Sequence, residues 1–447
     1  MNPIIPTVFS ADPSVHVWPG DDRIWIYASH DQPGTNTHDS MVSYHVFSST
    51  DMVHWTDYGS VFHLKDVSWA ISQMWAIDAV KWKGLYYMVY CAIEKNSGMF
   101  KTGLATSPLP EGPFQDIGFI EGVDNGQDPA LFVDEDGTPY LFWGQLGVCF
   151  GCRLTDDLRS AVRGTIVDLT KQLTWVFEGP FVHKFRGKYY LSYPGLYQNN
   201  WPEIMYYATA DHPLGPYSFR GEYIPFFEGQ AGTNHGSIVE YQGRWYAFYH
   251  SMWETGISEC RSLMCDYLEY DEEGQIKPII PSRIGVAAPG CKSGASRVTL
   301  MLGAETASLA RGTHHGVSVE TTIPGYTGRG YVTGMDKKYT GVTVMAQSGR
   351  DMDYRLRIRY CAPKAAEKLK VMVNTTTLLE DAREHTPRWD KHIPAPQASE
   401  WTELDCGIIS LKAGDNHIKA YTWDGSVGGL AIDCFLLDPL ENREAAD

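Results

Sequence analysis

A pattern of polar and apolar positions recurs five times between residues 12 and 249. Each copy begins with a polar residue, continues with a short alternating apolar segment and a turn containing glycine, and ends with an aromatic-rich segment. Such alternation is typical of β-strands. The first residues of the copies, here called the anchor residues, are separated by 66, 50, 50 and 57 positions and are Asp12, Asp78, Asp128, Glu178 and His235.

A repeat of about fifty residues made of short strands, without helical periodicity, is typical of four-stranded blades repeated around an axis. Five copies therefore predict a five-bladed β-propeller over residues 1–285. The first strand of each blade runs along the central channel. Because the anchor residues occupy the same place in each copy, we expect them to converge near one axis.

A second region of alternating strands follows the repeats. Residues 286–296 lie in a stretch with many prolines and glycines and are expected to form a linker. Residues 297–447 contain short alternating segments, including 354–360, 417–422 and 430–437. This pattern predicts a β-sandwich, so the whole chain is expected to be all-β.

Composition and charge narrow the classes of partner. The net charge of −17 argues against nucleic acid and anionic membranes, because both are bound through clusters of Lys and Arg. The 26 Tyr and 14 Trp supply flat faces on which sugar rings can stack. The chain starts without a basic, apolar leader, and its nine cysteines suit reduced thiols, so we expect a cytoplasmic protein without a membrane span.

Three of the anchor residues are acids, and this suggests a reaction. Hydrolysis of a glycoside with inversion needs one protonated carboxyl group and one carboxylate about 6.5–9.5 Å apart. Facing blades of a propeller provide such a gap. An Asp before Pro is in itself a common turn signal, but acids at equivalent blade positions would repel one another, which favours a catalytic role.

The settings of these acids are Ala11-Asp12-Pro13, Gln127-Asp128-Pro129 and Phe177-Glu178-Gly179-Pro180. Over about residues 8–280 the chain resembles glycoside hydrolase family 43. The resemblance implies an inverting five-bladed propeller enzyme. By the same resemblance Asp12 is the general base, Asp128 raises the pKa of the acid and orients it, and Glu178 is the general acid.

Three further residues are expected at the substrate. Asp78 follows Trp75-Ala76-Ile77, where the family usually has Trp-Ala-Pro, and is expected to hold its blade and active-site hydrogen bonds rather than to transfer protons. Trp75 either forms a wall of the sugar pocket or packs between blades. Arg261 either binds a sugar hydroxyl or the acids, or forms a salt bridge within the protein.

His235 stands in Thr233-Asn234-His235-Gly236. A histidine buried in the core is one interpretation. In the family that the chain resembles, a histidine here contacts a hydrated cation, commonly calcium, so the resemblance implies Ca²⁺ in the propeller channel and no organic cofactor.

The second region resembles carbohydrate-binding module family 6 or a relative of it. The resemblance places the acids of a structural calcium site at Glu305 and Asp433, but Gly303 stands where a second acid is common. Tyr331 and Trp423 are candidates for sugar stacking or for the core. Alternatively, this domain shapes the pocket of the propeller without binding sugar.

The layout most resembles β-xylosidases that also release arabinofuranose, acting on xylo- or arabino-oligosaccharides derived from hemicellulose. Alternatives are an arabinan- or galactan-cleaving enzyme of the same family and a non-catalytic sugar-binding propeller. The three intact acids argue against the non-catalytic alternative. Retaining fructosidases have a Trp-Met-Asn-Asp-Pro-Asn opening that this chain lacks. The sequence does not indicate an oligomeric state.

Overall fold

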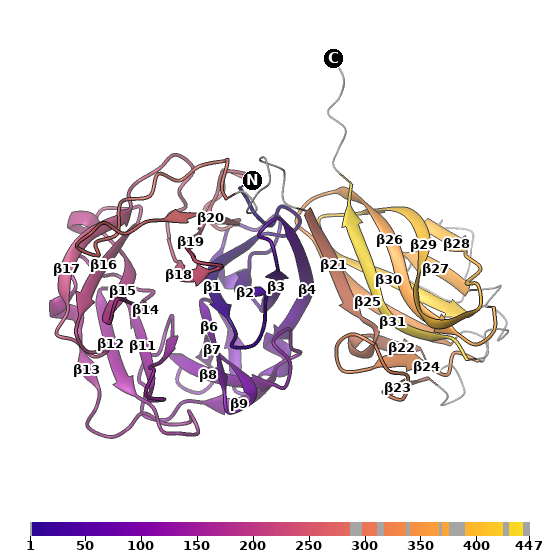
Figure 1. The fold of residues 1–447 in the computed structure, drawn as a ribbon, viewed down its shortest axis with the longest axis horizontal. Coiled ribbons are helices and arrows are strands. Elements are labelled where there is room, and N and C mark those ends of the chain that lie inside the picture. The colour runs from indigo at the N-terminus through magenta and orange to yellow at the C-terminus, as the bar shows by residue number, and fades with distance from the viewer. Residues whose placement is uncertain are drawn as a thin grey trace, which may run out of the picture. The chain divides into compact units, whose positions relative to one another are not determined.

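The structure is a computed structural model in which strands dominate and the helices are short 3-10 turns (Figure 1). The chain forms two compact units, residues 1–55 with 60–296 and residues 56–59 with 297–447. Within the described residues, no helix is long and apolar enough to cross a membrane. The described residues are 2–286, 297–310, 317–336, 340–365, 369–374, 389–422 and 429–440.

The first unit is built from antiparallel strands that pair in sequence order. The first group is β1 (Ser10–Val17), β2 (Ile24–His30), β3 (Ser43–Ser49) and β4 (His54–His63). The second is β5 (Ala70–Ser72), β6 (Ile77–Trp82), β7 (Leu85–Glu94), β8 (Phe100–Ser107) and β9 (Gln115–Phe119), where β5 and β6 both pair with β7.

Three more sheets follow in the same manner. They are β10 (Ala130–Val133), β11 (Pro139–Gln145), β12 (Val148–Arg153) and β13 (Val167–Asp168); β14 (Phe181–Phe185), β15 (Lys188–Gly195), β16 (Ile204–Ala210) and β17 (Ser218–Ile224); and β18 (Ser237–Tyr241), β19 (Arg244–Ser251) and β20 (Ser262–Leu268).

One strand from each of these five groups takes part in a closed ring of neighbours. β1 contacts β6, β6 contacts β10, β10 contacts β14, β14 contacts β18, and β18 contacts β1. Figure 1 shows the other strands of each group extending outward from this centre. Adjacent sheets pack through apolar side chains, as where Val182 and Leu191 meet Phe142. Each anchor residue therefore lies at or just before a central strand.

The second unit has two groups of strands. One is the sheet β22 (Ser308–Ala310), β25 (Gly341–Ser348), β30 (Gly414–Thr422), β27 (Leu369–Val373) and β28 (Trp389–His392). The other pairs β21 (Arg297–Gly303), β31 (Ala431–Pro439), β24 (Tyr331–Thr333) and β23 (Ser318–Glu320), with β26 (Met352–Ala362) between β31 and β29 (Ala398–Leu411).

Side chains from both groups of the second unit form one hydrophobic core, in which Val344 and Ile418 meet Leu356 and Phe435. Tyr331, a candidate for sugar stacking, is only 1% exposed, so its ring belongs to the interior. Trp423 and residues 287–296 of the predicted linker lie outside the described residues. The all-β prediction is confirmed, since strands dominate both units.

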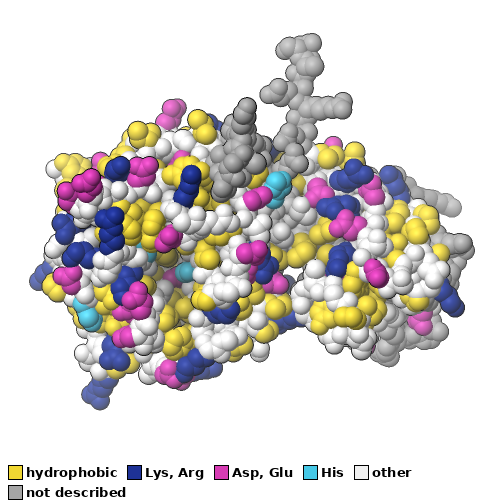
Figure 2. All heavy atoms as spheres, in the orientation of Figure 1, with side chains coloured by type: hydrophobic (Ala, Val, Ile, Leu, Met, Phe, Trp, Pro, Cys, Tyr) yellow, Lys and Arg dark blue, Asp and Glu magenta, His cyan; other side chains and the backbone are white. Residues whose placement is uncertain are grey.

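On the face drawn in Figure 2, Lys and Arg side chains are scattered among Asp and Glu. No basic patch gathers on this face, which agrees with the charge of the whole chain.

Candidate active site

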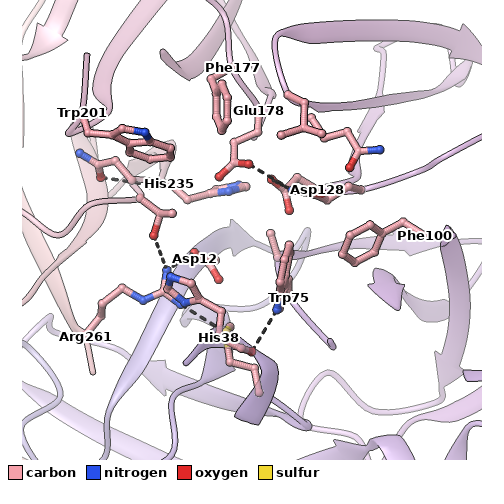
Figure 3. Close-up of a pocket in the computed structure, with 17 residues that line it drawn as sticks. Asp12, His38, Trp75, Phe100, Asp128, Phe177, Glu178, Trp201, His235 and Arg261 are labelled. Atoms are coloured by element: carbon pink, nitrogen blue, oxygen red, sulfur yellow. Dashed lines mark hydrogen bonds and ion pairs between the residues drawn. The ribbon is translucent and has the colours of Figure 1, made fainter. Parts of the chain in front are cut away.

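A cavity of about 370 Å³ opens at the starts of the central strands of the first unit. Four of the five anchor residues line it, namely Asp12, Asp128, Glu178 and His235. In Figure 3, Asp128 and Glu178 lie close together, and Asp12 lies apart from them beside Arg261. The cavity thus brings together acids that are up to 166 positions apart in the chain.

The backbone turns sharply at two of these acids. Asp12 has a φ of 53° and Asp128 a φ of 47°, both in the left-handed region that L-residues rarely adopt. At Asp12 the pairing of β1 with β2 shifts register between Ala11 and Ser14. Such a bulge redirects a side chain, and strained backbone of this kind concentrates at functional sites.

Asp12 is held as a carboxylate. Its Oδ2 accepts a hydrogen bond from Ser29 Oγ at 2.5 Å, and its Oδ1 lies 3.2 Å from Arg261 Nη1. Burial opposes ionisation of this group, but the Arg261 charge and the Ser29 hydrogen bond outweigh it and lower the Asp12 pKa well below its usual value. Asp12 is therefore ionised throughout the neutral range.

His250 contributes to Asp12 as a neutral group. Its Nδ1 accepts a hydrogen bond from the Asp12 backbone N–H at 3.1 Å, and its Nε2 donates to the Thr233 carbonyl at 3.0 Å. Burial, together with the Arg261 charge, lowers the pKa of His250 to about 3. The imidazole thus fixes the backbone at Asp12 without adding charge.

Arg261 is buried and bound within the protein. Its Nε and Nη2 each donate to a different oxygen of Asp31 at 2.9 Å, and Nη1 reaches Asp12 and Thr233 Oγ1. The fork of hydrogen bonds to Asp31 fixes the guanidinium plane. The structure displays both interpretations of Arg261, since it forms a salt bridge with Asp31 within the protein and also contacts the acid Asp12 at the cavity that it lines.

The pKa values of Glu178 and Asp128 are shifted in the opposite direction to that of Asp12. The Gln127 side-chain amide donates to Glu178 Oε2 at 3.1 Å and to Asp128 Oδ2 at 3.3 Å. Burial raises the pKa of Asp128 well above its usual value, and the nearby Glu178 and Asp12 add to this. Burial likewise raises the Glu178 pKa, and the charges of Glu203 and Asp12 reinforce the shift. One wall of the cavity therefore carries two carboxyl groups whose pKa values are raised.

Asp78 lies outside the residues that line the cavity. Its carboxylate accepts from Ser14 Oγ, from the backbone N–H of Ala79 at 2.7 Å and from that of Leu131 at 2.6 Å, and it pairs with His16 Nε2 at 2.7 Å. These partners come from three central strands, so Asp78 ties the ring together. The expected contact with substrate is not part of this arrangement.

Aromatic side chains form the walls of the cavity (Figure 3). Trp75 lines it, packs on Phe100 with ring centres 4.9 Å apart, and donates from Nε1 to the His38 carbonyl at 3.0 Å. On another side Phe177 meets Trp201 edge to face at 5.3 Å, and Trp201 remains 56% exposed. Flat apolar walls beside carboxyl groups suit a sugar ring.

The residues present do not form a metal site built by the protein. His235 lines the cavity, yet no group of three or more His, Cys, Asp or Glu side chains within the described ranges is arranged to hold a metal ion. Calcium prefers six to eight oxygen ligands, and one imidazole does not supply them. In the second unit, Asp433 pairs instead with Arg359. Calcium in the propeller channel stays a prediction.

Sequence reasoning missed several residues that complete the site. Gln127 directly precedes Asp128 in the sequence. This position alone could have marked Gln127 as a residue of the site. Asp31, Glu203 and His250 gave no signal, because each depends on a partner more than thirty positions away or in another sheet. Of the residues predicted for the site, Asp12, Trp75, Asp128, Glu178, His235 and Arg261 share the cavity.

An open cavity in which the carboxyl pKa is lowered at Asp12 and raised at Glu178, walled by aromatic rings, is the arrangement of an acid–base hydrolase acting on a carbohydrate. The model of glycosyl hydrolases family 43 matches residues 1–276. The chain therefore belongs to this family and is a glycoside hydrolase.

Curated relatives agree with this assignment. Xylosidase/arabinosidase 43A of Humicola insolens is 32% identical over 331 residues, covering 62% of this chain and 98% of the relative. A β-xylosidase of Xylanibacter ruminicola is 31% identical, covering 62% of this chain and 98% of the relative.

Solved structures are similar as well. A family 43 β-xylosidase/α-arabinofuranosidase from a compost metagenome, in complex with xylotriose, has a TM-score of 0.56 at 30% identity and covers 62% of this chain and 97% of its own. An arabinoxylan arabinofuranohydrolase from Bacillus subtilis has a TM-score of 0.58 over 98% of this chain and 97% of its own, and at 22% identity this likeness concerns the fold alone.

The C-terminal assignment needs a correction. The model of carbohydrate binding module family 35 matches residues 307–440, so the expected family 6 was wrong, although the region does match a carbohydrate-binding module.

Proposed function

We propose that the enzyme is an inverting glycosidase that frees xylose, arabinofuranose or both from hemicellulose-derived oligosaccharides. The observation that carries the proposal is one cavity lined by two carboxyl groups in different surroundings, with Asp12 bound by Arg261 and Ser29 and Glu178 bound by Gln127. Relatives named xylosidase/arabinosidase support the choice of sugar.

In the proposed reaction Asp12 accepts a proton from a water molecule that attacks the anomeric carbon, and Glu178 gives its proton to the leaving oxygen. The bond from the anomeric carbon to the leaving oxygen breaks as the bond to water forms. Asp128, linked to Glu178 through Gln127, orients the acid. The Asp12 and Glu178 carboxyl groups have exchanged protonation states when the cycle ends, and solvent restores them.

The fold proposed for this chemistry is a five-bladed β-propeller followed by a β-sandwich. The ring of contacts between β1, β6, β10, β14 and β18 supports the propeller. The single hydrophobic core shared by two groups of strands supports the sandwich.

A substrate panel tests the function. Hydrolysis of nitrophenyl β-xyloside, α-arabinofuranoside and galactoside is measured with the wild type and with Asp12→Ala as the base-free control. We expect turnover of the first or second substrate, reduced at least about a hundredfold in Asp12→Ala. Turnover of the galactoside alone, or equal rates in the variant, would contradict the proposal.

A further inference from the structure

Glu203 lies next to the proposed acid but does not line the cavity. It precedes β16 and is 0% exposed. Its backbone N–H donates to the Gly232 carbonyl at 3.0 Å, and its carbonyl accepts from Gln230 Nε2. Its Oε2 accepts from the Asn234 backbone N–H at 2.7 Å. The side chain is thus fixed between β16 and the segment that enters β18.

The second oxygen of Glu203 has no hydrogen-bond donor among the described residues. Oε1 is buried and unpartnered, while the carboxyl groups of Glu203 and Glu178 lie within hydrogen-bonding reach of each other. A buried carboxylate oxygen without a donor is costly. Two ionised carboxylates in contact would also repel each other. A single proton between them removes both penalties.

The surrounding charges favour one proton on the pair. Burial raises the pKa of Glu203 to about 8, and Asp128 and Asp12, where ionised, act in the same direction. Arg261 lies close enough to Glu178 to attract its carboxylate, and His235 Nδ1 faces the backbone at Gly179. Arg261, however, is already bound to Asp31 and Asp12, so its charge is largely balanced before Glu178 ionises.

We propose that Glu203 is a positioning residue that shares one proton with Glu178 and so keeps the acid protonated and fixed in the cavity wall. The inference rests on the proposed role of Glu178 as general acid. It adds the Glu203 carboxyl group to the residues that support this acid. Asp128 is linked to the acid through Gln127, whereas the Glu203 side chain acts on the Glu178 pKa by its charge and by a hydrogen bond between the two side chains.

The variant Glu203→Gln tests this with little change in shape. The amide oxygen can still accept from the Asn234 N–H, while the amide nitrogen can donate to an ionised Glu178. The variant therefore stabilises the ionised form of Glu178 relative to the protonated form, and the Glu178 pKa falls. We expect the basic limb of the kcat/KM profile for xylobiose or another hydrolysed oligosaccharide to move down by about one unit or more.

Glu228→Gln, at an exposed glutamate of the same region, is the matched control and should leave the limb in place. Thermal unfolding of each variant verifies that it is folded. If Glu203→Gln is folded and active but its basic limb matches the wild type, Glu203 does not hold the proton and the inference fails alone. If the wild type hydrolyses none of the glycosides, the proposed function fails and takes the inference with it.

Discussion

Ser29 provides a sharp test of how Asp12 is kept ionised. Ser29 lies on β2 opposite Ala11, is fully buried, and donates to Asp12 Oδ2 at 2.5 Å. Ser29→Ala removes this donor and leaves the Arg261 contact in place. The Asp12 pKa should therefore rise.

The size of the effect follows from the type of hydrogen bond. A hydrogen bond to a charged group contributes about 1.5–3 kcal/mol, and one pKa unit corresponds to about 1.4 kcal/mol. The Asp12 pKa should rise by about one to two units. Because the folded-state pKa of Asp12 lies below its unfolded value, Asp12 stabilises the fold above the unfolded pKa, and this contribution is lost as pH falls through the folded pKa. The variant reduces this contribution.

The assay is the acid limb of the kcat/KM profile, followed down to the lowest pH at which the protein stays folded. The limb should move up in Ser29→Ala, with little loss of rate near neutral pH, where Asp12 remains ionised. Ser192→Ala is the control, because Ser192 is a buried strand serine that bonds the Phe181 carbonyl at 3.4 Å and does not line the cavity. An acid limb that does not move in Ser29→Ala would refute the role assigned to this hydrogen bond.

Three other variants give separate tests. Glu178→Gln should lose about 10²–10⁴-fold in kcat on an oligosaccharide, whose leaving oxygen needs a proton, and much less on a nitrophenyl glycoside; equal losses on both would argue against the acid role. Arg261→Met should lower the free energy of unfolding, measured by denaturant titration, by about 3–5 kcal/mol, because it leaves Asp31 buried without its cation. The control Arg283→Met, at an exposed arginine, should change the free energy of unfolding little. Trp201→Ala should raise KM several-fold with kcat nearly unchanged, since an exposed wall contributes binding in both ground and transition states; a fall in kcat alone would contradict this.

The central strands were the predictable part of the fold. Each anchor residue stands at or just before β1, β6, β10, β14 or β18, because alternation and turn glycines are local features that sequence displays directly. The convergence of Asp12, Asp128, Glu178 and His235 then followed from the repeat.

The contacts that tune the site were not predictable from these patterns. Asp78 occupies the same place in its repeat as the acids, yet partners from neighbouring strands bind its carboxylate outside the cavity. Arg261 and Asp31 are 230 positions apart. Glu203 affects the site only through its effect on the Glu178 pKa, which the sequence pattern does not show. Such pairs depend on how sheets pack, which local pattern does not encode.

The most direct test of the account is the anomeric configuration of the sugar first released, followed by proton NMR before mutarotation. A carboxylate that activates water across the cavity from a carboxylic acid predicts an inverted product, so β-xylosides should release α-xylose. Initial release of β-xylose would mean that a carboxylate attacks the sugar itself, and this would contradict the roles proposed for Asp12 and Glu178.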